Sequence, residues 1–114
     1  MKKIEVYMRT EKLESVEQIL LGLGIESMTV TEIKELGAEN GHTEIYRGTE
    51  YAVSFIPRVR VDLLVREDLV EDCIKVITKH ARTGEIGDGK ILVMPVEEII
   101  SIRTGERGEF SLPS

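Results

Sequence analysis

The chain has 114 residues, 41% hydrophobic and 32% charged, which fits one globular domain with a modest core. Its net charge of -6 argues against a nucleic-acid-binding protein, and no apolar run is long enough to cross a bilayer. With a single cysteine, Cys73, and no secretion signal at the N-terminus, the protein is expected in the cytoplasm, without internal disulfides or membrane insertion.

The first part of the chain predicts a strand, a helix and a second strand. Residues 4–9 alternate apolar and mixed positions, which is typical of a strand with one buried face. Thr10 can cap a helix whose apolar residues recur at helical spacing until Gly24, a residue that favours a helix end. Residues 28–34 are rich in β-branched side chains and predict the second strand.

Residues 37–55 interrupt this pattern with three glycines in a polar stretch that carries two of the three tyrosines. A connection of this length is uncommon in so small a domain and is usually functional or mobile. We interpret it as a partner-binding or modifiable loop, and the alternative is a plain extension of a β-hairpin.

The second part repeats the first. Residues 59–65 alternate strictly and predict a third strand, and the acidic residues 67–68 begin a second helix. Cys73 falls on the apolar face of that helix, so we expect a buried structural thiol. Residues 91–94 predict a fourth strand and residues 99–102 a short final one.

This order of elements predicts an α+β ferredoxin-like double βαβ sandwich, a four-stranded antiparallel sheet with two helices on one face. The other face would stay uncovered and partly apolar, which favours oligomerisation with closed symmetry. The apolar residues expected on that face are Tyr7, Met28, Val30 and Leu64.

Residues 83–90 read Thr-Gly-Glu-Ile-Gly-Asp-Gly-Lys. Glycine allows successive backbone N–H groups to face one anion, and Lys90 adds a mobile charge beside them. The spacing from Gly84 to Lys90 matches a P-loop only up to Ile91, where that motif needs Ser or Thr. We interpret the segment as a phosphate cradle, and the alternative is a glycine-rich hairpin with a surface lysine.

A set of separate motifs lies at residues 27–32, 41–51, 81–91 and 102–106. Together they resemble the PII family of nitrogen-regulatory signalling proteins, with Ser27 in place of the family's usual glycine. The resemblance extends from Met1 to about Glu109. It implies a single domain, 1–114, with a T-loop at about 37–55, a phosphate loop at 82–90, a C-terminal loop at 98–109 and a flexible tail at 110–114.

The resemblance implies a homotrimer that binds ATP or ADP in the clefts between subunits. Gly87 to Lys90 would hold the phosphates, and Arg103 would reach in from the neighbouring subunit. Thr29, Asp62 and Leu64 would line the adenine and ribose end of the site, and Asp62 stands where glutamate is usual. The full set of implied nucleotide-binding residues is Thr29, Gly37, Ala38, Glu39, Asp62, Leu64, Gly87, Asp88, Gly89, Lys90 and Arg103.

The family's T-loop changes conformation to dock on target proteins. Arg47 matches the residue at the tip of the loop that would plug the pore of an ammonium channel. Tyr51 resembles the tyrosine that is uridylylated in many bacterial members. The implied partner is therefore an ammonium channel or a regulatory or biosynthetic protein.

Departures from the family's pattern concern Mg²⁺ and 2-oxoglutarate, the further ligands that the resemblance implies. The implied 2-oxoglutarate subsite comprises Glu39, Gly41 and Arg58, with Glu39 as the Mg²⁺ ligand. Members that sense 2-oxoglutarate present arginine and glutamine where this chain has Ala38 and Glu39, and often a basic residue where it has Ser101.

The carboxylate at Glu39 would repel a triphosphate and a dicarboxylate. At ~4 Å and an effective dielectric near 20, each like-charge pair costs on the order of 4 kcal/mol before Mg²⁺ and solvent offset it. We therefore expect a weak or altered 2-oxoglutarate response, with ADP or AMP relatively favoured.

Three functions are compatible with these residues, and we favour a non-enzymatic signalling adaptor, with a sensor of ADP or AMP only as a variant of it. A slow ATP or ADP hydrolase would use Glu39 or Asp62 as the base and Lys90 with Arg103 as charge stabilisers. A metal-handling protein of similar trimeric fold would need a ligand spacing that Cys73 and the two histidines lack.

Overall fold

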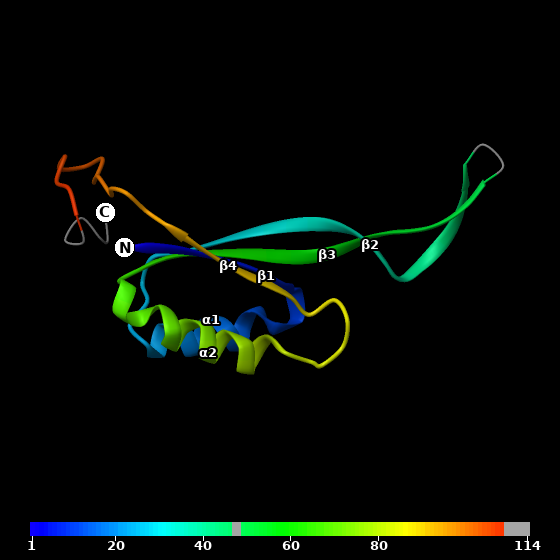
Figure 1. Cartoon of the computed structure of the whole chain (residues 1–114), viewed down its shortest axis with the longest axis horizontal. Helices are drawn as coiled ribbons and strands as arrows, with labels where there is room; N and C mark the ends of the chain where they lie inside the picture. Colours follow the sequence, from blue (N-terminus) through cyan, green and yellow to red (C-terminus); the bar gives the residue numbers. More distant parts are fainter. Residues whose placement is uncertain (47–48, 109–114) are drawn as a thin grey trace.

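The structure is a computed structural model that describes residues 1–46 and 49–108, and side chains within residues 1–36 and 55–108. Its strands are β1 (Lys2–Arg9), β2 (Met28–Tyr46), β3 (Thr49–Val65) and β4 (Gly89–Pro95). Its helices are α1 (Leu13–Gly22) and α2 (Val70–Ala81), each preceded by a 3₁₀ turn, Thr10–Lys12 and Glu67–Leu69. The strands form one antiparallel sheet in the order β2-β3-β1-β4, with both helices on one face (Figure 1). The predicted ferredoxin-like α+β fold is confirmed.

The core lies between the central strands and the helices, because alternate side chains of a strand point to one face. Ile4, Val6 and Met8 of β1 lie opposite apolar residues of β3, and these three side chains are at most 1% exposed. Cys73 of α2 is fully buried, as predicted. The other buried apolar residues are Val16, Leu20, Ile25, Val59, Val61, Leu63, Val65, Val70, Ile77 and Ala81.

The two ends of helix α1 are capped differently. At its C-terminus Gly24 adopts φ +86°, and Ile25 N–H donates to the Leu20 carbonyl at 3.1 Å while Gly24 N–H donates to Leu21 at 3.0 Å. These two bonds make a Schellman motif, which satisfies carbonyls that the helix leaves unpaired. Thr10, predicted to cap the N-terminus, instead begins the 3₁₀ turn, and no side-chain hydrogen bond caps it or α1.

Strands β2 and β3 continue beyond the rest of the sheet as a long β-hairpin (Figure 1). The Cα partners of β2 and β3 run from Met28 and Leu63 to Tyr46 and Thr49, with a register shift between Gly37 and His42. Most of the stretch 37–55 therefore has an extended backbone, which is the form that the hairpin alternative predicts. Whether this hairpin binds a partner is a separate question, and the functional interpretation stays a prediction.

The sheet face away from the helices is more polar than predicted. Tyr7 and Leu64 lie on it, but Met28 and Val30 lie opposite buried residues of β3 and so share the helix-covered face. The prediction for those two was wrong because β2 is an edge strand that the helices cover only in part, which leaves Val30 exposed on the core side. The polar side chains on the open face of β1 and β3 include Lys3, Glu5, Arg60 and Asp62.

The predicted final strand over residues 99–102 is wrong. Ile100 makes a single bridge with Arg107, and a turn lies between them. Ser101 is buried and shapes this turn, because its N–H donates to the Glu106 carbonyl at 2.9 Å and its carbonyl accepts from Gly105 N–H at 2.8 Å. Ile102 is fully exposed, so the apolar run that indicated a strand does not pack within its own described chain.

No helix in the described part of the chain combines the length and the hydrophobicity that a membrane span requires.

Candidate functional site

The connection from α2 to β4 folds around the carboxylate of Asp88. Asp88 Oδ2 accepts hydrogen bonds from the backbone N–H groups of Thr83 and Gly84, both at 2.9 Å. Asp88 Oδ1 accepts one from the Thr83 hydroxyl, whose oxygen in turn accepts from Glu85 N–H at 3.1 Å. One carboxylate therefore gathers the backbone of residues 83–88 into a tight turn.

Arg9, at the end of β1, fastens this turn to the sheet. Its Nε donates to Asp88 Oδ1 and its Nη2 donates to the Ile86 carbonyl, both at 3.1 Å. The Thr83 hydroxyl above all, together with the Thr83 and Gly84 N–H groups and Arg9, holds the pKa of Asp88 well below its usual range. The carboxylate is therefore ionised at any physiological pH.

Asp88 was predicted to hold phosphate, but its side chain faces its own turn. A carboxylate in contact with a phosphate would repel it. The Asp88 carboxylate instead accepts hydrogen bonds from three donors of the loop and from one donor of Arg9. The candidate anion ligands in this segment are therefore backbone N–H groups and the Lys90 ammonium group. The assignment of Gly87 to Lys90 to the phosphates stays a prediction.

Glycine is required where the loop meets the sheet. Gly87 and Gly89 adopt φ +100° and +111°, a region that other residues rarely occupy. A Cβ on Gly89 would lie 1.7 Å from the Tyr7 carbonyl oxygen, so the backbone passes β1 more closely than any side chain permits. Successive backbone units with such conformations form concave N–H nests that bind anions.

Lys90 lies on the open face of the sheet, directly after the loop. Its Nζ is 4.9 Å from the centroid of the Tyr7 ring, a cation–π arrangement. The Tyr7 hydroxyl donates to Glu5 Oε1 at 3.1 Å, and Lys3 Nζ lies 3.2 Å from Glu5 Oε2. The Lys3 hydrogen bond, more than the one from Tyr7, lowers the pKa of Glu5. This network fixes Tyr7 and leaves Lys90 as an exposed cation beside the glycines.

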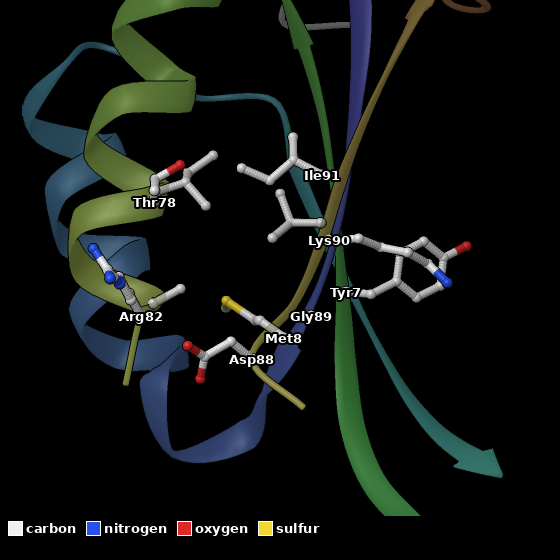
Figure 2. Close-up of a pocket in the computed structure, with 11 residues that line it drawn as sticks. Tyr7, Met8, Thr78, Arg82, Asp88, Gly89, Lys90 and Ile91 are labelled. Carbon is white, nitrogen blue, oxygen red and sulfur yellow. The ribbon is translucent and has the colours of Figure 1, made fainter. Parts of the chain in front are cut away.

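A hollow of about 240 Å³ lies on the other face of the sheet, between α2 and strands β1 and β4. Figure 2 shows Thr78, Arg82, Asp88 and Ile91 around it, whereas the side chains of Lys90 and Tyr7 project from the opposite side of the sheet. The hollow and the Lys90 ammonium group therefore cannot serve the same phosphate.

The residues predicted for the adenine and ribose end lie apart from Lys90. Thr29 and Asp62 are cross-strand partners on the open face, with Leu64 two residues further along β3. Asp62 Oδ2 accepts from Arg60 Nε at 3.2 Å, but its buried Oδ1 has no hydrogen-bond partner in the described chain. Because β2 and β4 are opposite edges of the sheet, Thr29 lies three strand spacings, roughly 14 Å, from β4.

Arg103 lies further away still. It is exposed in the turn that follows β4, whereas the glycine loop precedes that strand (Figure 1). The seven residues of β4 separate the two ends by about 20 Å. One chain therefore brings Lys90 together with Tyr7, but not with Arg103.

The predicted residues of the hairpin cannot be placed in the same way. Arg47 lies outside the described residues, and the residues whose side chains are outside the described part are Gly37, Ala38, Glu39, Gly41 and Tyr51. Arg58, at the base of the hairpin, is 7% exposed, and its Nη1 donates to the Pro57 carbonyl at 3.3 Å. The Mg²⁺, 2-oxoglutarate and modification assignments stay predictions.

Sequence reasoning missed Arg9 as part of this site, and it included Thr83 in the phosphate loop without giving it a role. Arg9 is 79 residues from Asp88, and local spacing gives no sign of their contact. The signal lies in the topology, because β1 pairs antiparallel with β4 and places Met8 opposite Gly89. The residue that follows Met8 is therefore the first candidate to contact the loop that precedes Gly89.

Comparison of the sequence with known proteins agrees with the family resemblance described above. A model of the family described as "Nitrogen regulatory protein P-II" matches residues 1–106. The nitrogen regulatory protein P-II of Azospirillum brasilense is 51% identical over 108 residues, which cover 95% of this chain and 96% of that protein. That of Haemophilus influenzae is 50% identical over 109 residues, 96% and 97% of the two chains. Nitrogen regulatory protein P-II 1 of Escherichia coli K12 is 46% identical over 112 residues, 98% and 100%.

Proposed function

This chain belongs to the nitrogen regulatory protein P-II family, a family of signal transducers rather than enzymes, and on that premise we propose how it acts. It binds ATP or ADP in clefts between the subunits of a homotrimer. The occupied cleft then sets the conformation of the β2–β3 hairpin, which docks on a target protein.

The observation that carries this proposal is the construction of the loop before β4. Its carboxylate, Asp88, is turned inward, and Gly87 and Gly89 take positive-φ conformations of the kind found in anion-binding backbone nests. Lys90 adds an exposed ammonium group beside them. In a chain of net charge -6, such a local concentration of donors suits a phosphate better than any other ligand class.

The separation of the predicted residues supports a site shared between subunits. Within one chain, Thr29 and Arg103 are each remote from Lys90, and a second copy would have to supply the missing side. The unpartnered Asp62 Oδ1 on the open face supports the same idea, because buried polar atoms are normally hydrogen-bonded. A donor on a neighbouring subunit or on the ribose would satisfy it.

The projecting hairpin supports a protein target. Strands β2 and β3 continue beyond the rest of the sheet, and an ammonium channel or a regulatory or biosynthetic protein would contact this hairpin. Arg47 and Tyr51 are the residues of the same segment that the family resemblance assigns to docking and modification. The cytoplasm is the compartment in which such a target would meet the adenine nucleotides.

A weak 2-oxoglutarate response is part of the proposal. The residues of the implied subsite support it. Glu39 brings a negative charge, and neither Ala38 nor Ser101 supplies the positive charge that would offset it. Ser101 is buried within its own turn and offers no charge. Mg²⁺ bound by Glu39 would offset part of the repulsion, and ADP or AMP would avoid it.

Calorimetric titration of the purified protein with ADP and with Mg-ATP tests the nucleotide site. We expect saturable binding to the wild type, a loss of at least about tenfold in affinity for Lys90→Met, and a trimer mass by light scattering. A monomer that releases no heat with either nucleotide would refute the proposal.

The 2-oxoglutarate part has its own test. We expect little heat when 2-oxoglutarate is added to the Mg-ATP-saturated protein, and measurable binding once Glu39→Gln is combined with Ala38→Arg. Tight binding to the unaltered chain would show that Glu39 does not act as we propose.

A further inference from the structure

We propose that Arg9 is a positioning residue of the phosphate loop, which sets the affinity for a nucleotide phosphate without touching the nucleotide. The inference rests on the proposed nucleotide site and names a residue outside the predicted ligand set. Arg9 belongs to β1, and its two loop contacts, to Asp88 and to Ile86, come from one guanidinium group.

The geometry of the guanidinium group suits this role. Its Nε and Nη2 donors lie in one plane, and here they bond to acceptors on Asp88 and Ile86, two residues apart in the loop, each at 3.1 Å. The Arg9 side chain is only 17% exposed, so solvent screens its part-buried bond to Asp88 less than it would on an open surface. Lysine could pair with Asp88 but could not hold the Ile86 carbonyl in the same orientation.

The bond to Ile86 acts directly on a candidate phosphate ligand. The Ile86 carbonyl and the Gly87 N–H belong to one trans peptide plane and point in opposite directions. When Arg9 holds the carbonyl toward β1, it therefore turns the Gly87 N–H away from β1. Gly87 is one of the residues predicted to hold phosphate. Because it has no Cβ, this peptide could rotate away from its present orientation, with φ at +100°, if the Arg9 bond were lost.

The bond to Asp88 acts on the rest of the loop. Asp88 in turn accepts the N–H groups of Thr83 and Gly84, so Arg9 stabilises the acceptor on which the turn depends. The sheet register also directs Arg9 toward the loop. Arg58 lies opposite Arg9 on β3, and like charges on neighbouring strands repel each other, whereas Asp88 neutralises Arg9.

Two variants and a matched control test the inference. Arg9→Gln removes the charge and the paired donors, and Arg9→Lys keeps the charge only. Arg66→Gln is the control, because Arg66 makes an equivalent Nε–Oδ1 pair, 3.2 Å from Asp68, at the opposite end of the sheet. Each protein is checked by circular dichroism, then measured by amide hydrogen exchange without nucleotide and by calorimetry with ADP.

We expect Arg9→Gln to accelerate exchange at Thr83 and Gly84, whose N–H groups donate to Asp88, and to weaken ADP binding by about tenfold, the equivalent of one well-placed hydrogen bond. Arg9→Lys should recover protection at Thr83 and Gly84, and its affinity for ADP should lie between those of Arg9→Gln and the wild type. Arg66→Gln should match the wild type in both measurements. Unchanged exchange at Thr83 and Gly84, or unchanged ADP affinity, in folded Arg9→Gln would overturn the inference. Failure of the wild type to bind ADP would overturn the proposed function, and the exchange data would then still decide whether Arg9 orders the loop.

Discussion

The substitution Gly89→Ala tests whether the loop and the sheet are joined as tightly as the structure indicates. Gly89 is the first residue of β4 and lies opposite Met8 in the antiparallel register. A Cβ at this position would lie 1.7 Å from the Tyr7 carbonyl oxygen and 2.8 Å from its carbon. Both neighbours are backbone atoms, so no side-chain rotation can relieve the contact.

The cost has two parts. Real Cβ contacts are essentially never shorter than 3.0 Å, so the strands must separate here by at least about 1.3 Å, enough to take an N–H···O bond beyond the ~3.2 Å limit. Losing the two bonds of one ladder pair costs about 0.5–1.5 kcal/mol each. The left-handed φ of +111° adds about 1–2 kcal/mol for a residue with a Cβ. The sum is roughly 2–5 kcal/mol of unfolding free energy.

Gly84→Ala is the matched control. Gly84 has φ +89° in the same loop, but a Cβ there would meet nothing within 4 Å, so only the cost of about 1–2 kcal/mol for the left-handed backbone should appear. Urea unfolding at one fixed protomer concentration measures both variants, because oligomerisation makes the apparent stability depend on concentration. If Gly89→Ala unfolds no more easily than Gly84→Ala, the close approach of β4 to β1 is not as described.

Two further predictions concern titratable groups. Asp88 has a lowered pKa, so its contribution to stability is present above the unfolded value near 3.9 and is lost only as the pH falls through the lower folded value. The amide NMR signals of Thr83 and Gly84 should therefore show no titration of Asp88 between about pH 6 and 3, and a midpoint near 4 would contradict the hydrogen bonds to Asp88. Burial raises the pKa of the Cys73 thiol, so a thiol reagent at pH 8 should modify it rapidly in urea but slowly in the native protein. Equal rates in the two states would show that Cys73 is not in the core.

Local patterns predicted the parts of the fold that depend on local physics. Alternation in residues 59–65 predicted a strand with one buried face, and Gly24 predicted where α1 ends. The failures occurred where the environment decides the outcome. The alternation in β2 shows that Val30 shares a face with Met28, but only the register with β3 decides that this is the helix-covered face. Residues 99–102 are apolar enough for a strand but have no neighbouring strand with which to form a ladder in the described chain.

In the candidate site, too, local features could be predicted from the sequence, whereas features that depend on tertiary contacts could not. The glycines and Lys90 could be predicted because the need for positive φ and for a cation is visible in residue types. The role of Asp88 could not, because the family resemblance assigns Asp88 to the phosphates without giving a direction for its side chain. That direction depends on Arg9, which reaches the loop only through the pairing of β1 with β4.

An acidic residue within a loop that we propose binds an anion can be explained once its partners are known. Asp88 organises the loop through N–H groups that point inward, and this requires a full negative charge on the carboxylate. The same charge would oppose a phosphate unless a cation accompanied it, and Arg9 is that cation, held at 3.1 Å on the sheet side. The pair is close to neutral for a ligand that approaches the glycines, so Lys90 acts as the uncompensated charge there. It follows that removing Arg9 alone should harm phosphate binding twice, through a misplaced Gly87 peptide and through an exposed Asp88 charge. Removing Asp88 and Arg9 together should harm it through the disordered loop only, so the double variant should bind ADP more tightly than the sum of the two single losses predicts.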